Sequence, residues 1–273
     1  MYLEKEVPPM YGYTPDCKYP AVYGERGIIV LTISTPITDN SINQIQHMSK
    51  NFERGAVPDD IHLTLINGET FHVIGQRSPS NAPELGINAV TLLPIQVENK
   101  LVGELADYFN WLKLLHDDHH GKSLGIDYSD KDSGKLSLTP TNIEFNHHSV
   151  ELSISIRYPI SVTEEDILTE LEKHIPVSST ISINKRMPSV VFDKHHKMID
   201  DMTDIYETVT QLDGTPVTTT GATYARTMPN IIAFGPSFPG QKGIAHNKDE
   251  YMTQNDLMMN LNIYGLLLAK LGS

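Results

Sequence analysis

The sequence predicts a chain of the mixed α/β and α+β classes, because strand patterns and helix patterns both recur along it. The clearest strand lies at 150–156, where apolar residues alternate with polar ones as in a half-buried strand. The clearest helix lies at 198–212, where apolar residues recur at helical spacing. A third signal is a β-hairpin at 61–75, where Asn67-Gly68 suits a type I′ turn.

The composition narrows the class of protein. The chain has 273 residues, enough for one large domain or two ordinary ones, and 39% are hydrophobic, so a sizeable core can form. The net charge of -13 argues against nucleic acid or an anionic membrane surface as a partner. A single cysteine, Cys17, excludes an internal disulfide and fits a reducing compartment. Glu4 and Glu6 break any signal peptide, and no apolar run reaches about 20 residues. We therefore expect a cytoplasmic protein with no nucleic-acid partner and no membrane partner.

The N-terminal part of the chain begins with irregular backbone. Met1 to Glu6 looks like the tail of a helix, and the prolines that follow, up to Pro20, impose extended and turned conformations. The apolar run at 27–36 predicts a strand. A mixed segment then predicts a short helix at about 41–51, before the hairpin.

The middle of the chain alternates helices and strands. The segment 86–115 predicts one apolar helix or a pair of helices, with Pro94 as a first-turn position or a kink. After the strand at 150–156, Thr163 caps a helix that runs to about residue 174. A short strand follows at 180–183. This strand–helix–strand order is typical of an α+β fold.

The stretch 221–250 has the strongest site character. A buried strand at 231–234 lies between two turns rich in Gly and Pro, and a lone His246 follows beside acidic residues. On residue chemistry alone, His246 is an ordinary surface-loop histidine, since one histidine is not a metal site. A last helix begins at Thr253. We expect six of its side chains to face inward: Leu257, Leu261, Tyr264, Leu267, Leu268 and Leu271.

Three groups of histidines have a metal-like composition. The segment 116–120 contains three histidines and two aspartates, but it lies at a polar helix end, where histidines interact well with the last carbonyls. The doublets His147-His148 and His195-His196 lie at turns or at the starts of elements. We interpret all three as surface histidines, and a metal site at 116–120 is the less favoured alternative.

Four short motifs carry a resemblance to a known family. The segments 220–226, Phe238-Pro239 and 246–250 follow one another in the family's order, and 12–20 matches a fourth family segment, Gly-(Phe/Tyr)-Thr-Pro-Asp. Together they resemble the zinc-dependent dipeptidases of the carnosinase and aminoacylase superfamily, in particular the bacterial PepV-type dipeptidases. The likeness runs from about Tyr2 to Leu271.

The resemblance implies a fold and a division into domains. Residues 1–23 and 188–273 would form the C-terminal part of an α/β zinc-peptidase catalytic domain, and 24–187 an inserted α+β lid domain, a ferredoxin-like plait. The first lid subdomain looks shortened, because Gly55–Pro58 passes almost directly into the hairpin, where the family has extra strands and a helix. We expect such a cut to leave an exposed sheet edge or apolar patch.

The resemblance also implies roles for single residues. Asp16 and His246 would be zinc ligands. Arg157, at the end of its strand, would grip the terminal carboxylate of a dipeptide, because a guanidinium binds a carboxylate in bidentate geometry. Without the resemblance, Asp16 is a turn aspartate and Arg157 an exposed arginine. Backbone N–H groups would hold the same carboxylate at Gly221, Ala222 and Thr223.

Two features depart from the family. This sequence lacks the His-x-Asp pair, the bridging aspartate and the Glu-Glu pair, which supply the remaining zinc ligands and the general base. We therefore assign no catalytic residue in this chain, expect zinc to bind weakly or not at all to this chain alone, and expect a separate N-terminal half to supply the rest. Pro79 occupies the place of the lid histidine, and loss of an oxyanion donor costs about 10²–10³ in rate.

Two hypotheses about function follow. The favoured one is metal-dependent hydrolysis of a dipeptide, by a zinc metallodipeptidase that is incomplete as a stand-alone catalyst. The alternative is a non-catalytic remnant or a peptide-binding or association module, which Pro79 and the shortened lid favour.

Overall fold

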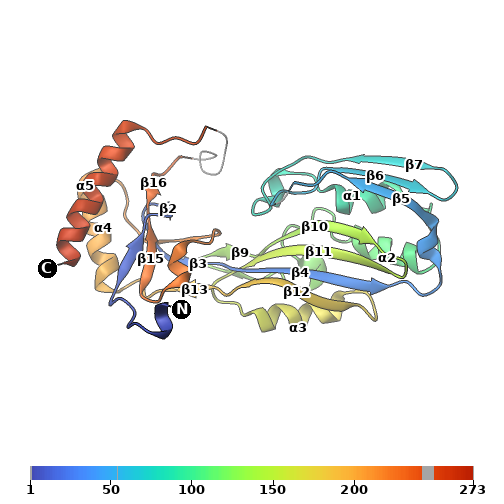
Figure 1. Ribbon diagram of the computed structural model, residues 1–273, viewed down its shortest axis with the longest axis horizontal. Helices are drawn as coiled ribbons and strands as arrows, with labels where there is room; N and C mark the ends of the chain where they lie inside the picture. The colour runs from blue at the N-terminus through green and yellow to red at the C-terminus, as the bar shows by residue number, and fades with distance from the viewer. Residues whose placement is uncertain (1, 54, 242–248, 273) are drawn as a thin grey trace. The chain divides into compact units, whose positions relative to one another are not determined.

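The computed structural model describes residues 2–53, 55–241 and 249–272. The chain divides into two compact units (Figure 1): Met1–Arg26 with Val190–Ser273, which we call the terminal unit, and Gly27–Ser189, which we call the central unit. Both units combine strands with helices, which confirms the predicted mixed α/β and α+β class. None of the helices in the described residues is long and apolar enough to cross a membrane.

The terminal unit is built on a small mixed sheet. Its strands lie in the order β1-β15-β3-β13, and β14 also pairs with β3. The β1–β15 and β14–β3 pairs are parallel, and the other two are antiparallel. A separate parallel pair joins β2 to β16. The bounds are β1 Gly12–Thr14, β2 Cys17–Lys18, β3 Ala21–Glu25, β13 Val190–Val191, β14 Val217–Thr219, β15 Ile231–Phe234 and β16 Pro236–Ser237, with 3-10 turns η1 Tyr2–Glu4 and η5 Tyr224–Thr227.

Two helices of the terminal unit, α4 (Lys197–Thr210) and α5 (Gln254–Leu271), pack against each other. Thr253 caps α5 as predicted, since its side chain accepts the N–H of Asp256. The predicted inward face of α5 is wrong in part. Leu257, Leu261 and Leu268 are 58%, 62% and 63% exposed. The packed side of α5 is a narrower stripe, because α4 and the sheet cover only one side of the helix; the buried residues of that stripe are Asn260, Ile263 and Leu267.

The central unit contains a four-stranded antiparallel sheet in the order β10-β11-β4-β12. The helix α3 (Glu164–His174) lies between β11 and β12 in the chain and begins with the predicted cap, a full capping box between Thr163 and Asp166. The strand predicted at 150–156 is therefore confirmed as part of β11. The bounds are β4 Gly27–Pro36, β10 Ser137–Phe145, β11 Ser149–Tyr158 and β12 Thr180–Met187, with a small pair β8 Ser129–Asp130 and β9 Gly134–Lys135.

A second sheet of the central unit has three strands, β5 (Ile45–Lys50), β6 (Asp60–Leu65) and β7 (Thr70–Ile74). The short helix predicted at 41–51 is wrong. Only one 3-10 turn, η2 (Ser41–Gln44), forms there, because the following residues pair with β6 in an antiparallel ladder. The predicted hairpin is confirmed by the β6–β7 pairing.

The turn of this hairpin differs from the predicted type I′. Gly68 has a φ of 87°, whereas Asn67 has no positive φ. The N–H of Gly68 donates to the carbonyl of Leu65 at 2.9 Å, and the N–H of Leu65 donates to the carbonyl of Glu69 at 2.8 Å. This is the longer hairpin loop, in which a glycine in the left-handed conformation follows a tight turn.

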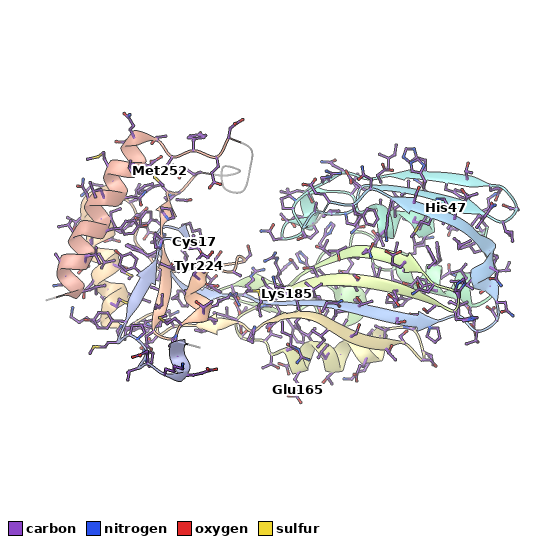
Figure 2. All side chains as sticks on the ribbon, viewed as in Figure 1. Cys17, His47, Glu165, Lys185, Tyr224 and Met252 are labelled. Carbon is purple, nitrogen blue, oxygen red and sulfur yellow. The ribbon has the colours of Figure 1, made fainter. Side chains whose placement is uncertain are left out.

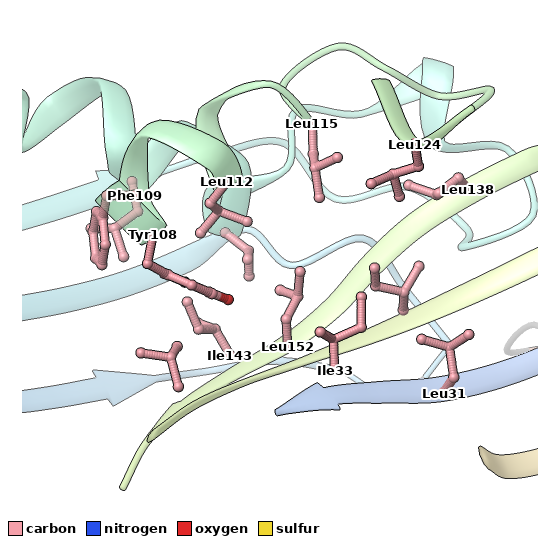
Figure 3. Close-up of a cluster of buried hydrophobic side chains, with 14 of the residues drawn as sticks. Leu31, Ile33, Tyr108, Phe109, Leu112, Leu115, Leu124, Leu138, Ile143 and Leu152 are labelled. Carbon is pink, nitrogen blue, oxygen red and sulfur yellow. The ribbon is translucent and has the colours of Figure 1, made fainter. Parts of the chain in front are cut away.

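The core of the central unit lies between one face of the four-stranded sheet and its helices (Figure 3). The segment 86–115 forms a pair of helices, α1 (Ala89–Gln96) and α2 (Gly103–Lys113), and Pro94 lies inside α1. Figure 3 shows side chains of α2 and the residues after it meeting those of β4, β10 and β11: Tyr108, Phe109, Leu112, Leu115, Leu31, Ile33, Leu138, Ile143 and Leu152. Buried and less buried residues alternate along β4 and β11, and the opposite face of the sheet carries the less buried, mainly polar ones.

Candidate functional site

The structure brings Asp16 to the turn that begins the stretch 221–250. The carboxylate oxygen Oδ2 of Asp16 accepts the backbone N–H of Tyr224 at 2.9 Å. The parallel pairing of β1 with β15 carries these two distant parts of the chain to the same place. Figure 2 labels Cys17 and Tyr224, which flank the contact. Asp16 itself is exposed.

A buried ion pair holds this turn. The carboxylate of Glu25 accepts the N–H of Thr223 at 3.1 Å and also the hydroxyl of Thr223. It further accepts Nε of Arg226 at 2.5 Å, and the two charged side chains are only 4% and 7% exposed. Arg226 also donates to the backbone carbonyl of Arg26. The pair is therefore a structural clamp that fixes the shape of the turn beside Asp16.

The predicted carboxylate-binding N–H groups have different surroundings. The N–H of Gly221 donates to the hydroxyl oxygen of Thr219 at 3.1 Å, and that of Thr223 donates to Glu25. Ala222 is exposed at the tip of the turn. In this arrangement Ala222 is best placed of the three to meet a ligand, and the role itself stays a prediction.

The zinc ligands implied by the resemblance are not completed by the described residues. His246 lies outside the described residues. Asp16 belongs to no group of three His, Cys, Asp or Glu side chains in the part of the chain that the structure describes. Burial raises the pKa of the neighbouring Cys17 thiol. These residues alone therefore do not fit a zinc centre.

Arg157 lines a cavity of about 800 Å³ that lies wholly within the central unit. The cavity floor is the polar face of the four-stranded sheet. Arg157 is half-buried and stands near the end of β11, opposite Ile28 of β4. Lys185, labelled in Figure 2, lines the same cavity from β12.

Two loops of the second sheet complete the cavity wall. Gly55 and Ala56 line it from one loop, and Ser80 lines it from the other. The loops are joined by a bridge between Ala56 and Pro79, and the N–H of Ser80 donates to the carbonyl of Gly55 at 2.8 Å. The fold thus gathers around one cavity three positions that the sequence singled out separately: the strand-end arginine, the segment before Val57-Pro58 and the loop that holds Pro79.

The charge of the cavity favours an anionic ligand. Among the described lining residues, the cations are Lys50, Arg157 and Lys185, and the single carboxylate is Glu53. Glu53 is itself engaged by Arg77, which lies outside the lining. Lys50 is likewise engaged from outside the lining by Glu144, with which it pairs, and it also donates to the side chain of Asn142 at 2.6 Å, which leaves Arg157 and Lys185 as the cations that carry the excess charge. A concave surface with excess positive charge raises the local concentration of anions.

The histidine groups weighed in the sequence form no cluster of ligands among the described residues. His116 Nδ1 lies 3.2 Å from the hydroxyl of Thr91, and His120 Nδ1 lies 2.8 Å from the carbonyl of Leu136. A different group of three, Asp60, His62 and His72, is the one whose ligand atoms converge. Sequence reasoning missed it, although the hairpin signal was present: 62 and 72 lie equally far from Asn67 and therefore face each other.

The fold resembles that of a solved structure. Aminopeptidase PepT from Bacillus cereus ATCC 10987 matches it with a TM-score of 0.50 and 10% identity, over 96% of this chain and 57% of that chain. The model of Peptidase family M20/M25/M40 matches residues 20–270, so the chain belongs to this family. The resemblance to dipeptidases of this kind is thereby confirmed.

Curated relatives agree with the family. The Beta-Ala-Xaa dipeptidase of Lactobacillus delbrueckii subsp. lactis is 23% identical over 302 residues, which cover 99% of this chain and 64% of the relative. Relatives from Staphylococcus haemolyticus (strain JCSC1435) and Bacillus subtilis (strain 168) are each 24% identical and are covered over 64% and 65% of their lengths. The chain thus spans just under two thirds of these relatives, each of which is a single chain, and they give no support to a separate N-terminal half.

Proposed function

We propose that this chain takes part in the metal-dependent hydrolysis of dipeptides, and that the cavity of the central unit binds the substrate's terminal carboxylate through Arg157. The observation that carries the proposal is the cavity itself, a polar surface with three cations and one carboxylate among its described lining residues. Family membership and the dipeptidase name of a relative support the reaction class.

The physical basis is the guanidinium of Arg157. It offers a planar fork of donors that matches the two oxygens of a carboxylate, and it keeps its charge at any physiological pH. The cavity shields that charge from water, which strengthens its attraction for an anion. Lys185 lines the same cavity and adds to the attraction. We infer that Arg157 orients the dipeptide and does not itself react.

The metal part of the proposal rests on the family. Zinc is the metal that the family resemblance implies, and the described residues of this chain do not complete a site for it. Asp16 and His246 are the residues we propose as its ligands in this chain. We assign no general base here, and the proline at position 79 offers no donor to the developing oxyanion. We further propose that the terminal unit is part of the catalytic domain and the central unit its lid.

The alternative function is a peptide-binding module without catalysis. Pro79, which bridges Ala56 beside the cavity, favours it, because the family's lid histidine, which would assist the reaction, is replaced there by proline. Both proposals require that Arg157 binds the terminal carboxylate of the peptide, and they differ only in whether the peptide is hydrolysed.

The experiment compares two dipeptides, one with a free C-terminal carboxylate and one with a C-terminal amide, by calorimetry with zinc present. A charge-assisted hydrogen bond is worth about 1.5–3 kcal/mol, so Arg157→Ala should weaken binding of the free dipeptide about 10- to 100-fold. The amide should bind weakly to both proteins. Arg186→Ala is the matched control, because Arg186 is an exposed arginine of β12 that pairs with Glu164 at 2.8 Å.

Parallel assays of hydrolysis decide between the two functions. Release of free amino acids with zinc supports the dipeptidase, and binding without release supports the module. Equal affinity of the carboxylate and amide forms, or equal effects of Arg157→Ala and Arg186→Ala, would disprove binding of the terminal carboxylate by Arg157, and absence of both binding and release would disprove both functions.

A further inference from the structure

The outer face of the three-stranded sheet carries Asp60, His62 and His72. Strand alternation places them there, because the intervening residues Ile61, Leu63 and Val73 are each fully buried in the core. The antiparallel register sets His62 directly opposite His72. Asp60 lies two residues before His62 on the same strand and therefore on the same face. All three functional groups thus project from one rigid hairpin.

The side chains converge on one point. The imidazole rings of His62 and His72 are stacked, with centroids 3.8 Å apart and planes 16° apart. Nε2 of His72 lies 3.0 Å from Oδ1 of Asp60, and Nε2 of His62 lies 3.5 Å from the same oxygen. One ligand atom from each residue lies within 4.8 Å of the other two.

These separations match a metal's coordination sphere. Zinc binds imidazole nitrogen at about 2.0–2.1 Å and carboxylate oxygen at about 2.0–2.2 Å, so two ligand atoms of a tetrahedral site lie roughly 3.3 Å apart. The two distances to Asp60 lie on either side of that value. Because the side chains of Asp60, His62 and His72 are 37%, 54% and 45% exposed, an ion can enter from solvent and keep an open position for water.

The plain alternative is a hydrogen bond between His72 and Asp60, which a distance of 3.0 Å also permits. That bond needs one imidazole only. It leaves unexplained why the second imidazole stacks on the first and turns its own Nε2 toward the same carboxylate oxygen. A cation shared by all three groups accounts for both features.

We propose that Asp60, His62 and His72 form a binding site for a first-row divalent metal ion of the zinc, nickel or copper type, the metals that imidazole ligands suit. The site joins β6 to β7, so the ion stabilises the hairpin. It lies entirely within the central unit and shares no residue with the zinc ligands proposed at Asp16 and His246. It does not depend on the proposed function.

The test is equilibrium dialysis of the untagged full chain against Zn²⁺, in an Asp16→Ala background that disables the other proposed site. We expect about one zinc per chain. His62→Ala and His72→Ala should each weaken this binding at least tenfold, while His147→Ala, which removes an exposed histidine elsewhere in the central unit, should leave it unchanged. Substitution with Co²⁺ should give a visible absorption band of tetrahedral type that His72→Ala abolishes.

Because the ligand side chains project to solvent, the variants should keep the circular dichroism of the parent. Zinc should raise the melting temperature of the parent but not of the His72→Ala variant, because a ligand that binds only the folded state stabilises it. Absence of bound zinc in the Asp16→Ala chain would overturn the proposal. So would equal zinc loss in the His147→Ala control, since that result means non-specific binding to surface histidines.

Discussion

At the scale of single residues, Glu25 organises the turn beside Asp16. Its two carboxylate oxygens accept hydrogen bonds from the N–H and the hydroxyl of Thr223, and the carboxylate forms an ion pair with Arg226. Both members of the ion pair are buried, so each depends on the other: an unpaired charge in such a place is far more costly than the pair is stabilising. Asp16 is held in turn by the N–H of Tyr224, the residue that follows Thr223.

Glu25→Gln should therefore destabilise the terminal unit strongly. The amide keeps the shape of the side chain but removes the charge, and the guanidinium of Arg226 is left buried without its counter-charge. We expect a loss of about 3–5 kcal/mol in the free energy of unfolding, measured by urea denaturation followed by circular dichroism.

The matched control is Glu98→Gln, which makes the same chemical change in an exposed pair with Lys113. That change should cost no more than about 1 kcal/mol. A similar cost for the two variants would contradict the role given to Glu25.

At the scale of elements, the close approach of β4 to β11 depends on a missing side chain. Gly27 lies opposite Tyr158, the last residue of β11. A Cβ atom on Gly27 would lie 1.8 Å from the Cζ atom of the Tyr158 ring, far inside van der Waals contact. The ring is 2% exposed and cannot swing into solvent without opening the end of the sheet. Arg157, next to Tyr158, owes its place at the cavity to this packing.

Gly27→Ala should lower the stability of the central unit by about 1–3 kcal/mol, the usual cost of overpacking. It should also weaken dipeptide binding, because the strand end that carries Arg157 must shift. Urea denaturation and calorimetry measure the two effects.

Gly265→Ala is the control, and it should raise the free energy of unfolding where Gly27→Ala lowers it. A Cβ atom there meets nothing within 4 Å, and the residue lies inside α5, where alanine is favoured over glycine by about 0.5–1 kcal/mol. A Gly27→Ala variant as stable as the parent would contradict the proposed packing.

At the scale of the whole molecule, the two units have separate cores. The main cluster of buried side chains runs from Ile29 to Leu171 and lies entirely in the central unit. The terminal unit has its own aromatic cluster, in which Tyr19 contacts Phe234 edge-on with centroids 4.9 Å apart. The hydroxyl of Tyr19 donates to the buried Asn260 of α5 at 2.6 Å, which links the sheet to the helix.

Residues 27–189 should therefore fold when expressed alone, because they are continuous in the chain and contain a complete core. We expect cooperative urea unfolding and the circular dichroism of a mixed α/β protein. A non-cooperative transition, or exposed hydrophobic surface that binds dye, would show that this core needs the terminal unit.

The sequence was informative where structure depends on neighbours along the chain. Alternation revealed β11, and Thr163 and Thr253 marked the starts of α3 and α5. It failed where distant partners decide. The segment 45–50 becomes a strand only because β6 pairs with it, and the leucines of α5 are exposed because α4 covers another side. The contact of Asp16 with Tyr224 was not predicted, because the resemblance implied only a zinc-ligand role for Asp16, and the histidine pair needed the strand register.

The position of Trp111 has a practical consequence. It is the single tryptophan of the sequence, it lies in α2, and its indole N–H donates to the carbonyl of His174 at the end of α3 at 2.9 Å. Its fluorescence therefore reports on the central unit alone, because the terminal unit contains no tryptophan. The urea midpoint followed by tryptophan fluorescence should therefore fall in Gly27→Ala and stay at the parent value in Glu25→Gln, which assigns each loss of stability to one unit.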